Sequence, residues 1–290
     1  MDPNTQAVSK VTVPIILERK LRGEKISCLT AYDYSMARLV DEAGIEMILV
    51  GDSLAQAVLG YDSTVPVTVD EILHHLRAVR RGVRHALLIG DLPYGSYHVS
   101  DEQALACAIR FLKEGGAEAV KLEGGRQRAP LVRKLVEAQI PVMGHIGLTP
   151  QSIHAMGGYR VQGRTLDSAT ELLADAEALE EAGTFAVVLE GIPRELAAVI
   201  TRRLRIPTIG IGAGPECDGQ VLVFHDLVGL SYQRPAKFVR TYINLREILH
   251  RVLVEYRTDI AEGRYPGDQE SYHWPAALSQ QFDKETARSV

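Results

Sequence analysis

The segment Met47-Ile48-Leu49-Val50-Gly51-Asp52 is a run of four large apolar residues that ends in a glycine and an acid. Four apolar residues in succession are expected of a β-strand buried on both faces, as the strands of a parallel sheet are. The acid then stands at the carboxyl end of the strand. This segment predicts a parallel α/β fold with a polar group at one edge of its sheet.

Seven more runs of this kind alternate with segments of helical period between about residues 26 and 225. Such alternation predicts repeated strand–helix units around a parallel sheet. Eight strands favour a closed (β/α)8 TIM barrel over an open, doubly wound sheet. The predicted strands cover residues 26–31, 47–52, 86–91, 119–123, 141–146, 185–190, 207–212 and 221–225.

A partial internal repeat supports the barrel. Glu42-Ala-Gly44, Glu114-Gly-Gly116 and Glu181-Ala-Gly183 each lead through a short turn into an apolar strand that ends in an acid. A glycine directly after a helix is typical of a left-handed C-terminal cap, and Gly82 is expected to serve the same purpose. The repeating unit is therefore a helix, a glycine cap, a strand and an acid.

The barrel domain is predicted to span residues 25–262, including its terminal helices. Residues 1–24 are expected to form an N-terminal extension with a helix near residues 14–21, and residues 235–262 to form one or two further helices. The C-terminal tail, residues 263–290, contains prolines, glycines and many polar residues, which indicates loose packing or contacts between subunits. No separate second domain is expected.

The composition indicates a small-molecule partner. The chain of 290 residues is 46% hydrophobic and 24% charged, with a net charge of −5 and no block of like charges. Binding to nucleic acid or to an anionic membrane is therefore not expected. Because neither a signal peptide nor an apolar run of about 18 residues is found, a cytoplasmic location is expected. Cys28, Cys107 and Cys217 have no disulfide or metal spacing and are expected to be buried free thiols.

Four carboxylates end predicted strands: Asp52, Asp91, Glu123 and Glu190. In parallel barrels, functional groups lie at the carboxyl ends of the strands, so these acids are expected to surround one mouth. A single acid could equally cap the next helix or form a surface ion pair. Four together would repel unless a cation or a shared proton compensates. Without a cysteine or histidine pair at ligand spacing, oxygen ligation favours Mg²⁺ over Zn²⁺.

Two basic side chains belong to the same set of strands. Lys121 and Glu123 are two residues apart, so both side chains point to the same side of their strand. Next to acids, Lys121 is interpreted as an anchor for an anionic substrate, although a structural lysine whose ammonium group reaches solvent is the alternative. For His145, at another strand end, a donor to the substrate and a hydrogen-bonded core histidine are both open.

The stretch Gly210-Ile-Gly212-Ala-Gly214 resembles a dinucleotide-binding fingerprint only superficially. Its spacing is G-x-G-x-G rather than G-x-G-x-x-G, and it occurs late in the chain. It is interpreted as a tight turn that lets a ligand or another backbone approach closely.

Several longer motifs resemble those of the ketopantoate hydroxymethyltransferase family. They extend over about residues 10–273 in the family's order, and together they are far more specific than any one alone. The motifs are Thr30-Ala-Tyr-Asp-Tyr34, Val50-Gly-Asp-Ser53, Gly60-Tyr-Asp-Ser-Thr64 with Pro66-Val-Thr68, Asp91-Leu-Pro93, Val120-Lys-Leu-Glu-Gly-Gly125, Gly144-His-Ile-Gly-Leu-Thr-Pro-Gln-Ser152, Gly157-Gly-Tyr159 with Val161-Gln-Gly163, Ile206-Pro-Thr-Ile-Gly-Ile-Gly-Ala-Gly214, and Asp218-Gly-Gln220.

The resemblance implies a (β/α)8 barrel like those of the phosphoenolpyruvate/pyruvate superfamily, with Mg²⁺ as cofactor. The implied reaction transfers a hydroxymethyl group from 5,10-methylenetetrahydrofolate, the co-substrate, to α-ketoisovalerate (3-methyl-2-oxobutanoate). It passes through a Mg²⁺-stabilised enolate and yields ketopantoate and tetrahydrofolate in pantothenate biosynthesis. The resemblance also implies a homo-oligomer, either a decamer or an octamer.

The resemblance assigns binding roles by motif match. Asp52, Asp91 and Glu123 fall on metal-site positions, with Glu123 acting through water. Asp52, Ser53, Asp91 and Lys121 fall on positions that bind the ketoacid. Lys121 would add positive charge near the negative charge that develops in the reaction.

The resemblance also places Glu190 on the position of the base that accepts the C3 proton, a task suited to a carboxylate. His145 and Tyr32 are expected to line the pocket. Two positions depart from the family pattern: Ala55-Gln56-Ala57 stands where a glycine and larger apolar residues are commoner, and Gly191 stands where cysteine or another larger residue is expected. Both bear on the volume of the pocket.

Two other functions are weighed against this one. Another Mg²⁺-dependent carbon–carbon lyase or mutase of the same superfamily is the nearest, but several such enzymes carry a reactive cysteine in a Lys-Lys-Cys-Gly-type loop that this chain lacks. The second is a noncatalytic, ketoacid-binding barrel protein, which would be expected to lose Glu190 or Lys121. Both residues are present.

Overall fold

Residues 9–287, which a computed structural model describes, contain eight parallel strands that close into a barrel. Each strand pairs with the next along the chain, and the last pairs with the first. The predicted (β/α)8 class is confirmed. The strands are β1 (Ile26–Thr30), β2 (Met47–Val50), β3 (Leu87–Asp91), β4 (Ala119–Lys121), β5 (Val142–Gly147), β6 (Ala186–Glu190), β7 (Thr208–Ile211) and β8 (Gly219–Leu222).

The predicted eighth strand, residues 221–225, is wrong in its bounds. Strand β8 begins at Gly219, and its end is followed by a short helix, α10 (Phe224–Leu227). A Cβ atom on Gly219 would lie 2.5 Å from the carbonyl oxygen of Ile26, so the glycine permits the close pairing of β8 with β1. A strand that starts with glycine and glutamine lacks the apolar run that marks the other seven.

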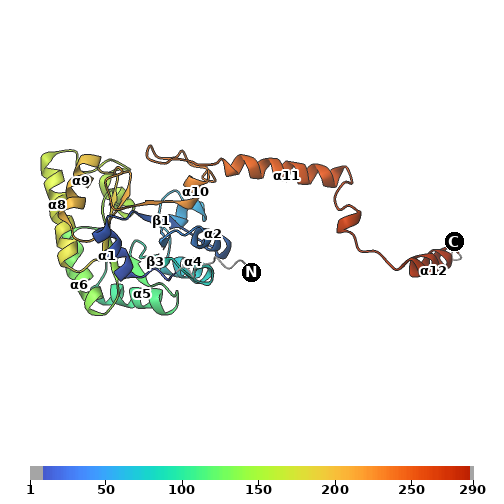
Figure 1. Ribbon diagram of the computed structural model, residues 1–290, viewed down its shortest axis with the longest axis horizontal. Coiled ribbons are helices and arrows are strands. Elements are labelled where there is room, and N and C mark those ends of the chain that lie inside the picture. The colour runs from blue at the N-terminus through green and yellow to red at the C-terminus, as the bar shows by residue number, and fades with distance from the viewer. Residues whose placement is uncertain (1–8, 288–290) are drawn as a thin grey trace. The chain divides into compact units, whose positions relative to one another are not determined.

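Helices surround the barrel, as Figure 1 shows for α4, α5, α6, α8 and α9. Their starts follow ordinary capping rules: Thr68 and Glu71 form a reciprocal capping box before α4, and Ser100 caps α5. The long helices of this layer are α2 (Tyr34–Glu42), α4 (Val69–Gly82), α5 (Asp101–Lys113), α6 (Ala129–Glu137), α8 (Leu166–Glu181) and α9 (Arg194–Arg203). Shorter ones are α3 (Leu54–Ala57), α7 (Ile153–Met156) and the 3-10 turns η1 (Arg126–Arg128) and η2 (Pro150–Ser152).

Alternation along the strands divides the apolar residues between two cores. On β2, Ile48 and Val50 point outward and pack against the surrounding helices. Met47 and Leu49 point inward and belong to the cluster that fills the barrel. Successive side chains of a strand point to opposite faces of the sheet, and here both faces are buried. This explains why the apolar run in the sequence is unbroken.

The predicted N-terminal helix is present as α1 (Val13–Arg22). Its Ile16 is fully buried in the interior cluster, together with Ile26 at the start of β1 and Phe185 just before β6. Since these neighbours lie at the amino ends of strands, α1 closes the end of the barrel opposite to the predicted site. This segment is part of the barrel unit rather than a peripheral extension.

The C-terminal boundary also differs from the predicted one at residue 262. The barrel unit ends at Tyr242, and the unit that begins at Ile243 contains α11 (Leu245–Ala261), a 3-10 turn η3 (Asp268–Glu270) and α12 (Ala276–Thr286). Residues 235–244 form no helix, in part because Pro235 donates no backbone hydrogen bond. Neither α11 nor α12 buries a residue.

The glycine caps are confirmed at Gly44, Gly116 and Gly183, whose φ angles are 79°, 72° and 99°. The prediction for Gly82 is wrong, because this glycine is the last residue of α4 and does not have a positive φ. A Cβ atom here would lie 2.7 Å from the carbonyl oxygen of Tyr34. Gly82 therefore serves the close packing of α4 against α2.

All three cysteines are free thiols; Cys28 and Cys217 are buried, whereas Cys107 is only half-buried. Among the described residues, no helix has both the length and the apolar character needed to cross a lipid bilayer.

Candidate active site

The alternation that fills the barrel with apolar side chains also places the polar ones at its mouth. On β6, Ala186 and Val188 face the interior, and Glu190 follows two residues later. On β4, Ala119 faces the interior and is followed by Lys121. Because side chains two apart share a face, Glu190 and Lys121 project from the inner wall at the carboxyl end of the barrel.

Lys121 and Asp91 form a buried ion pair at the centre of this mouth. They are register partners on β4 and β3, and Lys121 Nζ lies 2.7 Å from Asp91 Oδ1 and 2.9 Å from Oδ2. The same ammonium group lies 3.7 Å from Glu123 Oε1. Lys121 is only 4% exposed, which excludes the alternative of a lysine that reaches solvent.

Burial and mutual charge control the protonation of this pair. Burial raises the pKa of Asp91 to about 7, although the positive charge of Lys121 opposes that rise. Burial would lower the pKa of Lys121, but the carboxylates of Asp91, Glu123 and Asp52 together raise it above its usual range. We therefore treat Lys121 as a fixed positive charge at the base of the mouth.

Glu123 is held by two residues that the sequence did not single out. The backbone N–H of Gln151 donates to Glu123 Oε2 at 3.0 Å, and the backbone N–H of Glu123 donates to the Tyr97 hydroxyl at 3.2 Å. Tyr97 in turn donates to Gln151 Oε1 at 2.5 Å. Gln151 lies in the quoted motif that follows β5, which is the only sequence signal for it; Tyr97 has none.

Asp52 is joined to the same network although it lies two residues beyond the end of β2. The Gln151 side-chain amide donates to Asp52 Oδ2 at 3.0 Å and to the carbonyl of Leu92 at 3.0 Å. The backbone N–H of Asp52 donates to Asp91 Oδ2 at 3.1 Å. One glutamine thus spans the ends of β2, β3 and β5, and it fixes Asp52 beside Asp91.

Ser53 lines the mouth, whereas Tyr32 does not. The expectation that Tyr32 lines the pocket is not met, because its side chain is 1% exposed and lies behind the wall. Its hydroxyl is 2.8 Å from Ser53 Oγ, and burial raises its pKa. Tyr32 is therefore a neutral phenol that lies behind Ser53 and hydrogen-bonds to its hydroxyl group.

His145 lies between two of the acids. Its Nε2 is 3.2 Å from Glu190 Oε2, and its Nδ1 is 3.5 Å from Glu123 Oε1. Burial, reinforced by the charge of Lys121, lowers the pKa of His145 well below its usual value, so the ring is neutral. Neither ring nitrogen has a well-aligned hydrogen bond among the described residues.

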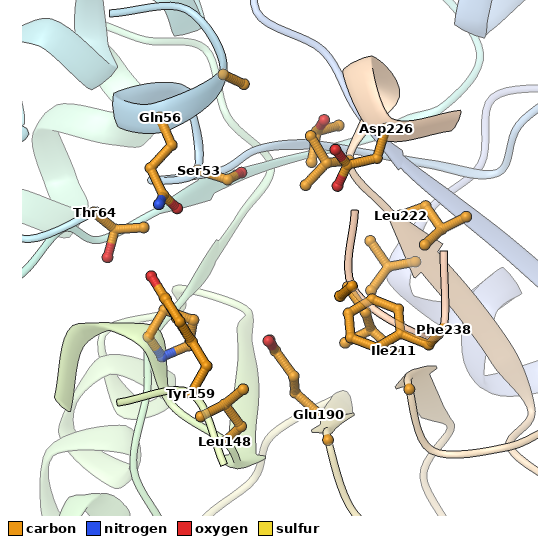
Figure 2. A pocket seen from close by; sticks show the side chains of 18 of the residues that line it. Ser53, Gln56, Thr64, Leu148, Tyr159, Glu190, Ile211, Leu222, Asp226 and Phe238 are labelled. Carbon is orange, nitrogen blue, oxygen red and sulfur yellow. The ribbon is translucent and has the colours of Figure 1, made fainter. Parts of the chain in front are cut away.

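Glu190 has the environment of a base poised near neutrality. Burial raises its pKa to about 8, with Lys121 opposing and Asp52 adding to the rise. Figure 2 shows its side chain directed into the cavity, away from the wall of β6. A carboxyl group that titrates near neutral pH is suited to removing a proton from carbon.

All the predicted site residues except Tyr32 line one cavity of about 1200 Å³ at this end of the barrel. Ligand pockets for drug-sized molecules measure about 300–1000 Å³, so this cavity has room for more than a small ketoacid. The polar residues at its base are Asp52, Ser53, Asp91, Lys121, Glu123, His145 and Glu190.

The two departures from the family pattern both lie on the cavity wall. Gly191 has a φ of 56°, and a Cβ atom there would lie 3.1 Å from Leu148 Cβ, so a larger residue would be strained in this conformation. Gln56 donates to the carbonyl of Asp62 at 3.0 Å and faces the hydroxyl of Tyr159 (Figure 2). Ala57 also lines the cavity, which its small side chain leaves wide.

The donor set suits a magnesium ion in its chemistry. Four carboxylates face one ammonium group and a neutral imidazole, and the buried Glu123 Oε1 has no hydrogen-bond partner among the described residues. Oxygen ligands of this kind are those that Mg²⁺ prefers. Within residues 9–287, however, no three acidic, histidine or cysteine side chains converge as closely as a bound ion would need. Lys121 occupies part of the space between Asp91 and Glu123.

The profile of the ketopantoate hydroxymethyltransferase family matches residues 10–268. The chain belongs to the ketopantoate hydroxymethyltransferase family. It is 61% identical over 267 residues to the 3-methyl-2-oxobutanoate hydroxymethyltransferase of Koribacter versatilis (strain Ellin345), covering 92% of this chain and 90% of the relative. It is 58% identical over 265 residues to the enzyme of the same name from Frankia casuarinae (strain DSM 45818 / CECT 9043 / HFP020203 / CcI3), covering 91% and 89%.

Solved structures share the barrel fold. Phosphonopyruvate hydrolase, in a complex with oxalate and Mg²⁺, aligns with a TM-score of 0.58 at 13% identity and covers 95% of this chain and 96% of the hydrolase. 2,3-Dimethylmalate lyase, a member of the PEP mutase/isocitrate lyase superfamily, aligns with a TM-score of 0.56 at 14% identity and covers 94% and 98%. At such identities the likeness concerns the barrel alone.

Membership of a hydroxymethyltransferase family confirms the resemblance drawn from the motifs and the prediction of an enzyme.

Proposed function

We propose that this protein transfers a hydroxymethyl group from 5,10-methylenetetrahydrofolate to α-ketoisovalerate, and so forms ketopantoate and tetrahydrofolate. The observation that carries the proposal is the juxtaposition, at one barrel mouth, of a buried ammonium group, Lys121, and a carboxylate with a pKa near 8, Glu190. The names of relatives up to 61% identical support it.

The ketoacid carries a carboxylate and a carbonyl oxygen, and both need positive partners. Lys121 provides a fixed positive charge, and Ser53 provides a hydroxyl group on the same wall. In a buried site, such preorganised charge stabilises the negative charge that moves onto the carbonyl oxygen as the enolate forms. Asp91, by pairing with Lys121, fixes the position of the ammonium group.

Glu190 is the proposed base for the C3 proton of the ketoacid. The neutral ring of His145, 3.2 Å from Glu190 Oε2, limits the orientations of this carboxylate and contributes no competing charge. Water adds to the one-carbon unit of 5,10-methylenetetrahydrofolate and releases tetrahydrofolate and formaldehyde. The enolate carbon attacks the formaldehyde carbon, whose oxygen takes up the proton held by Glu190 and becomes the new hydroxyl group. The wide cavity above Glu190 leaves room for that second substrate.

We propose Mg²⁺ as the cofactor, held by Asp52 and Asp91 directly and by Glu123 through water. When bound, it would supply a positive charge that polarises the ketoacid carbonyl. Glu123 Oε1 accepts no hydrogen bond from the described residues, and carboxylates are in excess at the mouth; both observations support this donor set. Lys121 would keep its pairing with Asp91 on one side of the site.

A homo-oligomer, a decamer or an octamer, is also proposed. Exposed apolar side chains on α11, in the C-terminal unit, support this proposal. They are Leu249, Leu253, Tyr256 and Ile260, which are 43–65% exposed. Light scattering of the full-length protein measures the subunit number directly, and a monomer at micromolar concentration would contradict this part of the proposal.

The reaction is tested by following ketopantoate with NMR, using purified protein, α-ketoisovalerate, 5,10-methylenetetrahydrofolate and Mg²⁺. Product is expected only when both substrates are present, and EDTA in excess over Mg²⁺ should abolish it. No product under these conditions would overturn the proposed function. In that case, binding of α-ketoisovalerate without turnover would favour a noncatalytic ketoacid-binding protein.

A further inference from the structure

One wall of the cavity takes no part in the proposed chemistry on the ketoacid. It is formed by the ends of β7 and β8 and by residues 223–238. Figure 2 shows Ile211, Leu222 and Phe238 gathered on this side with Asp226 above them, whereas Leu148 and Tyr159 stand on the other side. This wall is therefore an apolar surface with one carboxylate at its edge.

Phe238 is seated on the glycine-rich turn that follows β7. Gly212 has a φ of 63°, and a Cβ atom at this position would lie 2.6 Å from Cδ1 of the Phe238 ring. Any larger residue would push the ring away. The rest of the ring is open, since Phe238 is 38% exposed and lines the cavity. The G-x-G-x-G stretch thus presents an aromatic face to a ligand.

Asp226 is a carboxylate that forms no ion pair with the described residues. Ser231 Oγ donates to its Oδ1 at 2.5 Å, which fixes the side chain. In the part of the chain from residue 9 to 287, no lysine, arginine or histidine nitrogen lies within 4.0 Å of it. A half-buried carboxylate beside apolar side chains needs hydrogen-bond donors, because its desolvation is otherwise uncompensated. Neither the ketoacid nor the proposed Mg²⁺ site uses it.

We propose that Asp226 and Phe238 bind the pterin ring of the folate donor, an inference that rests on the proposed function. The 2-amino group and N3–H of a pterin are two parallel donors, which match the two oxygens of a carboxylate as a guanidinium group does. The flat ring offers a π-face for stacking on Phe238. This wall adjoins Glu190, whose register partner on β7 is Ile211, so the one-carbon unit of a folate bound there can reach the ketoacid.

The test separates folate binding from ketoacid chemistry. Asp226→Asn keeps the acceptor for Ser231 but replaces the other oxygen with a donor that cannot accept from the pterin. We expect this variant to raise KM for 5,10-methylenetetrahydrofolate at least about tenfold, the effect of losing hydrogen bonds to a charged group. Exchange of the ketoacid C3 proton without folate should stay within about twofold of the wild type. Asp167→Asn, at an exposed acid in the first turn of α8 and outside the cavity, is the matched control and should leave the folate KM unchanged.

A modified ligand makes the test specific to the pterin edge. A tetrahydrofolate analogue with a methyl group in place of the 2-amino group should bind the wild type about tenfold or more weakly than tetrahydrofolate. It should bind Asp226→Asn with no comparable further loss, because contacts that form one interaction are not additive. Phe238→Ala should weaken tetrahydrofolate binding severalfold, and Phe238→Tyr, which keeps the π-face, should not.

Three outcomes would overturn the inference. These are a folate KM within twofold of the wild type in Asp226→Asn, an equal loss of proton exchange and folate affinity in that variant, or additive losses for variant and analogue. An equal loss would show that Asp226 only holds the loop through Ser231. If the wild type itself makes no ketopantoate and exchanges no proton, the proposed function fails instead, which is a distinguishable result.

Discussion

The two walls of the cavity differ in how they are built. The wall formed by β2 to β5 carries Asp52, Asp91, Lys121, Glu123 and His145, all of which are at most 5% exposed. Strand register, the ion pair and the amide of Gln151 fix them. The wall formed by β6 to β8 carries Glu190 at a strand end and, beyond it, loop residues that are partly open to solvent. The first wall holds a fixed pattern of charges. The second carries the residues that we propose act on the C3 proton and on the second substrate.

The largest effect is expected from Glu190, the proposed base for the C3 proton, which lies on the second wall. Glu190→Gln should lower kcat for ketopantoate formation about 10²–10⁴-fold, because a general base contributes that much. The affinity for α-ketoisovalerate, measured by calorimetry, should change little, since the first wall is intact. Glu195→Gln, an exposed acid on α9, is the control. If Glu190→Gln kept more than a tenth of the wild-type kcat, Glu190 would not be the base, and a residue of the first wall would have to accept the proton.

Lys121→Met tests whether the first wall depends on its single cation. Removing one member of a buried ion pair leaves the other uncompensated, which costs about 3–5 kcal/mol of unfolding free energy. KM for the ketoacid should rise as well. Lys113→Met, at the exposed end of α5, should be neutral. If urea denaturation at pH 7 gave the same unfolding free energy for Lys121→Met and the wild type, the ammonium group would not be required to stabilise the buried carboxylates of Asp91 and Glu123.

The same variant has a pH signature with a definite sign. Without Lys121, the pKa of Asp91 should rise further above its unfolded value, because burial already raises it to about 7. The folded state then binds the extra proton, so stability should decrease as pH rises from about 4 through the folded pKa. The difference in unfolding free energy between Lys121→Met and the wild type should therefore become smaller as the pH is lowered toward 5. A gap that widens on acidification would contradict this account.

The pKa of Glu190 predicts how ketoacid exchange depends on pH. Because burial raises that pKa to about 8, the ionised base becomes scarcer below it. The value of kcat/KM for proton exchange should rise about tenfold per pH unit between pH 5.5 and 7 and level off above pH 8. A profile that is flat over this range would show that Glu190 is fully ionised in the free enzyme.

A smaller effect is expected for Gln151, which links three strands of the first wall without touching the proposed reacting atoms. Gln151→Leu removes donors to Asp52 and Leu92 and should cost about 1–3 kcal/mol of stability. We expect KM for the ketoacid and the apparent affinity for Mg²⁺ to weaken by up to about tenfold, with kcat reduced less. A loss of kcat as large as that of Glu190→Gln would require a direct catalytic role for Gln151.

The first wall could be predicted from the sequence because strand alternation decides it. Once the apolar runs that begin at Leu87 and Ala119 are interpreted as strands, the side of the sheet that Lys121 faces and the position of Asp91 follow. The supporting residues could not be predicted in the same way. Tyr97 lies in a loop whose path is set by tertiary contacts, and Gln151 lies in a short turn with no periodicity to read.

The second wall shows where the sequence stops being sufficient. Glu190 could be predicted because it ends an apolar strand. Strand β8 begins with residues that are not apolar, and its predicted bounds were wrong for that reason. Phe238 and Asp226 reach the cavity from a segment with no strand pattern, between the end of β8 and Tyr242. In the sequence, only the glycine-rich turn at Gly212 predicted that another group packs closely against the backbone there. It gave no indication that this group is the ring of Phe238.

The central claim is that Glu190 removes the C3 proton of the ketoacid at a mouth whose charge is fixed by the opposite wall. It is tested most directly by NMR of α-ketoisovalerate in D₂O with Mg²⁺ and without folate, comparing wild type with Glu190→Gln. The account predicts exchange of deuterium into C3 by the wild type and a rate at least about a hundredfold lower in the variant, as expected for loss of a general base. Equal rates in the two proteins would contradict it.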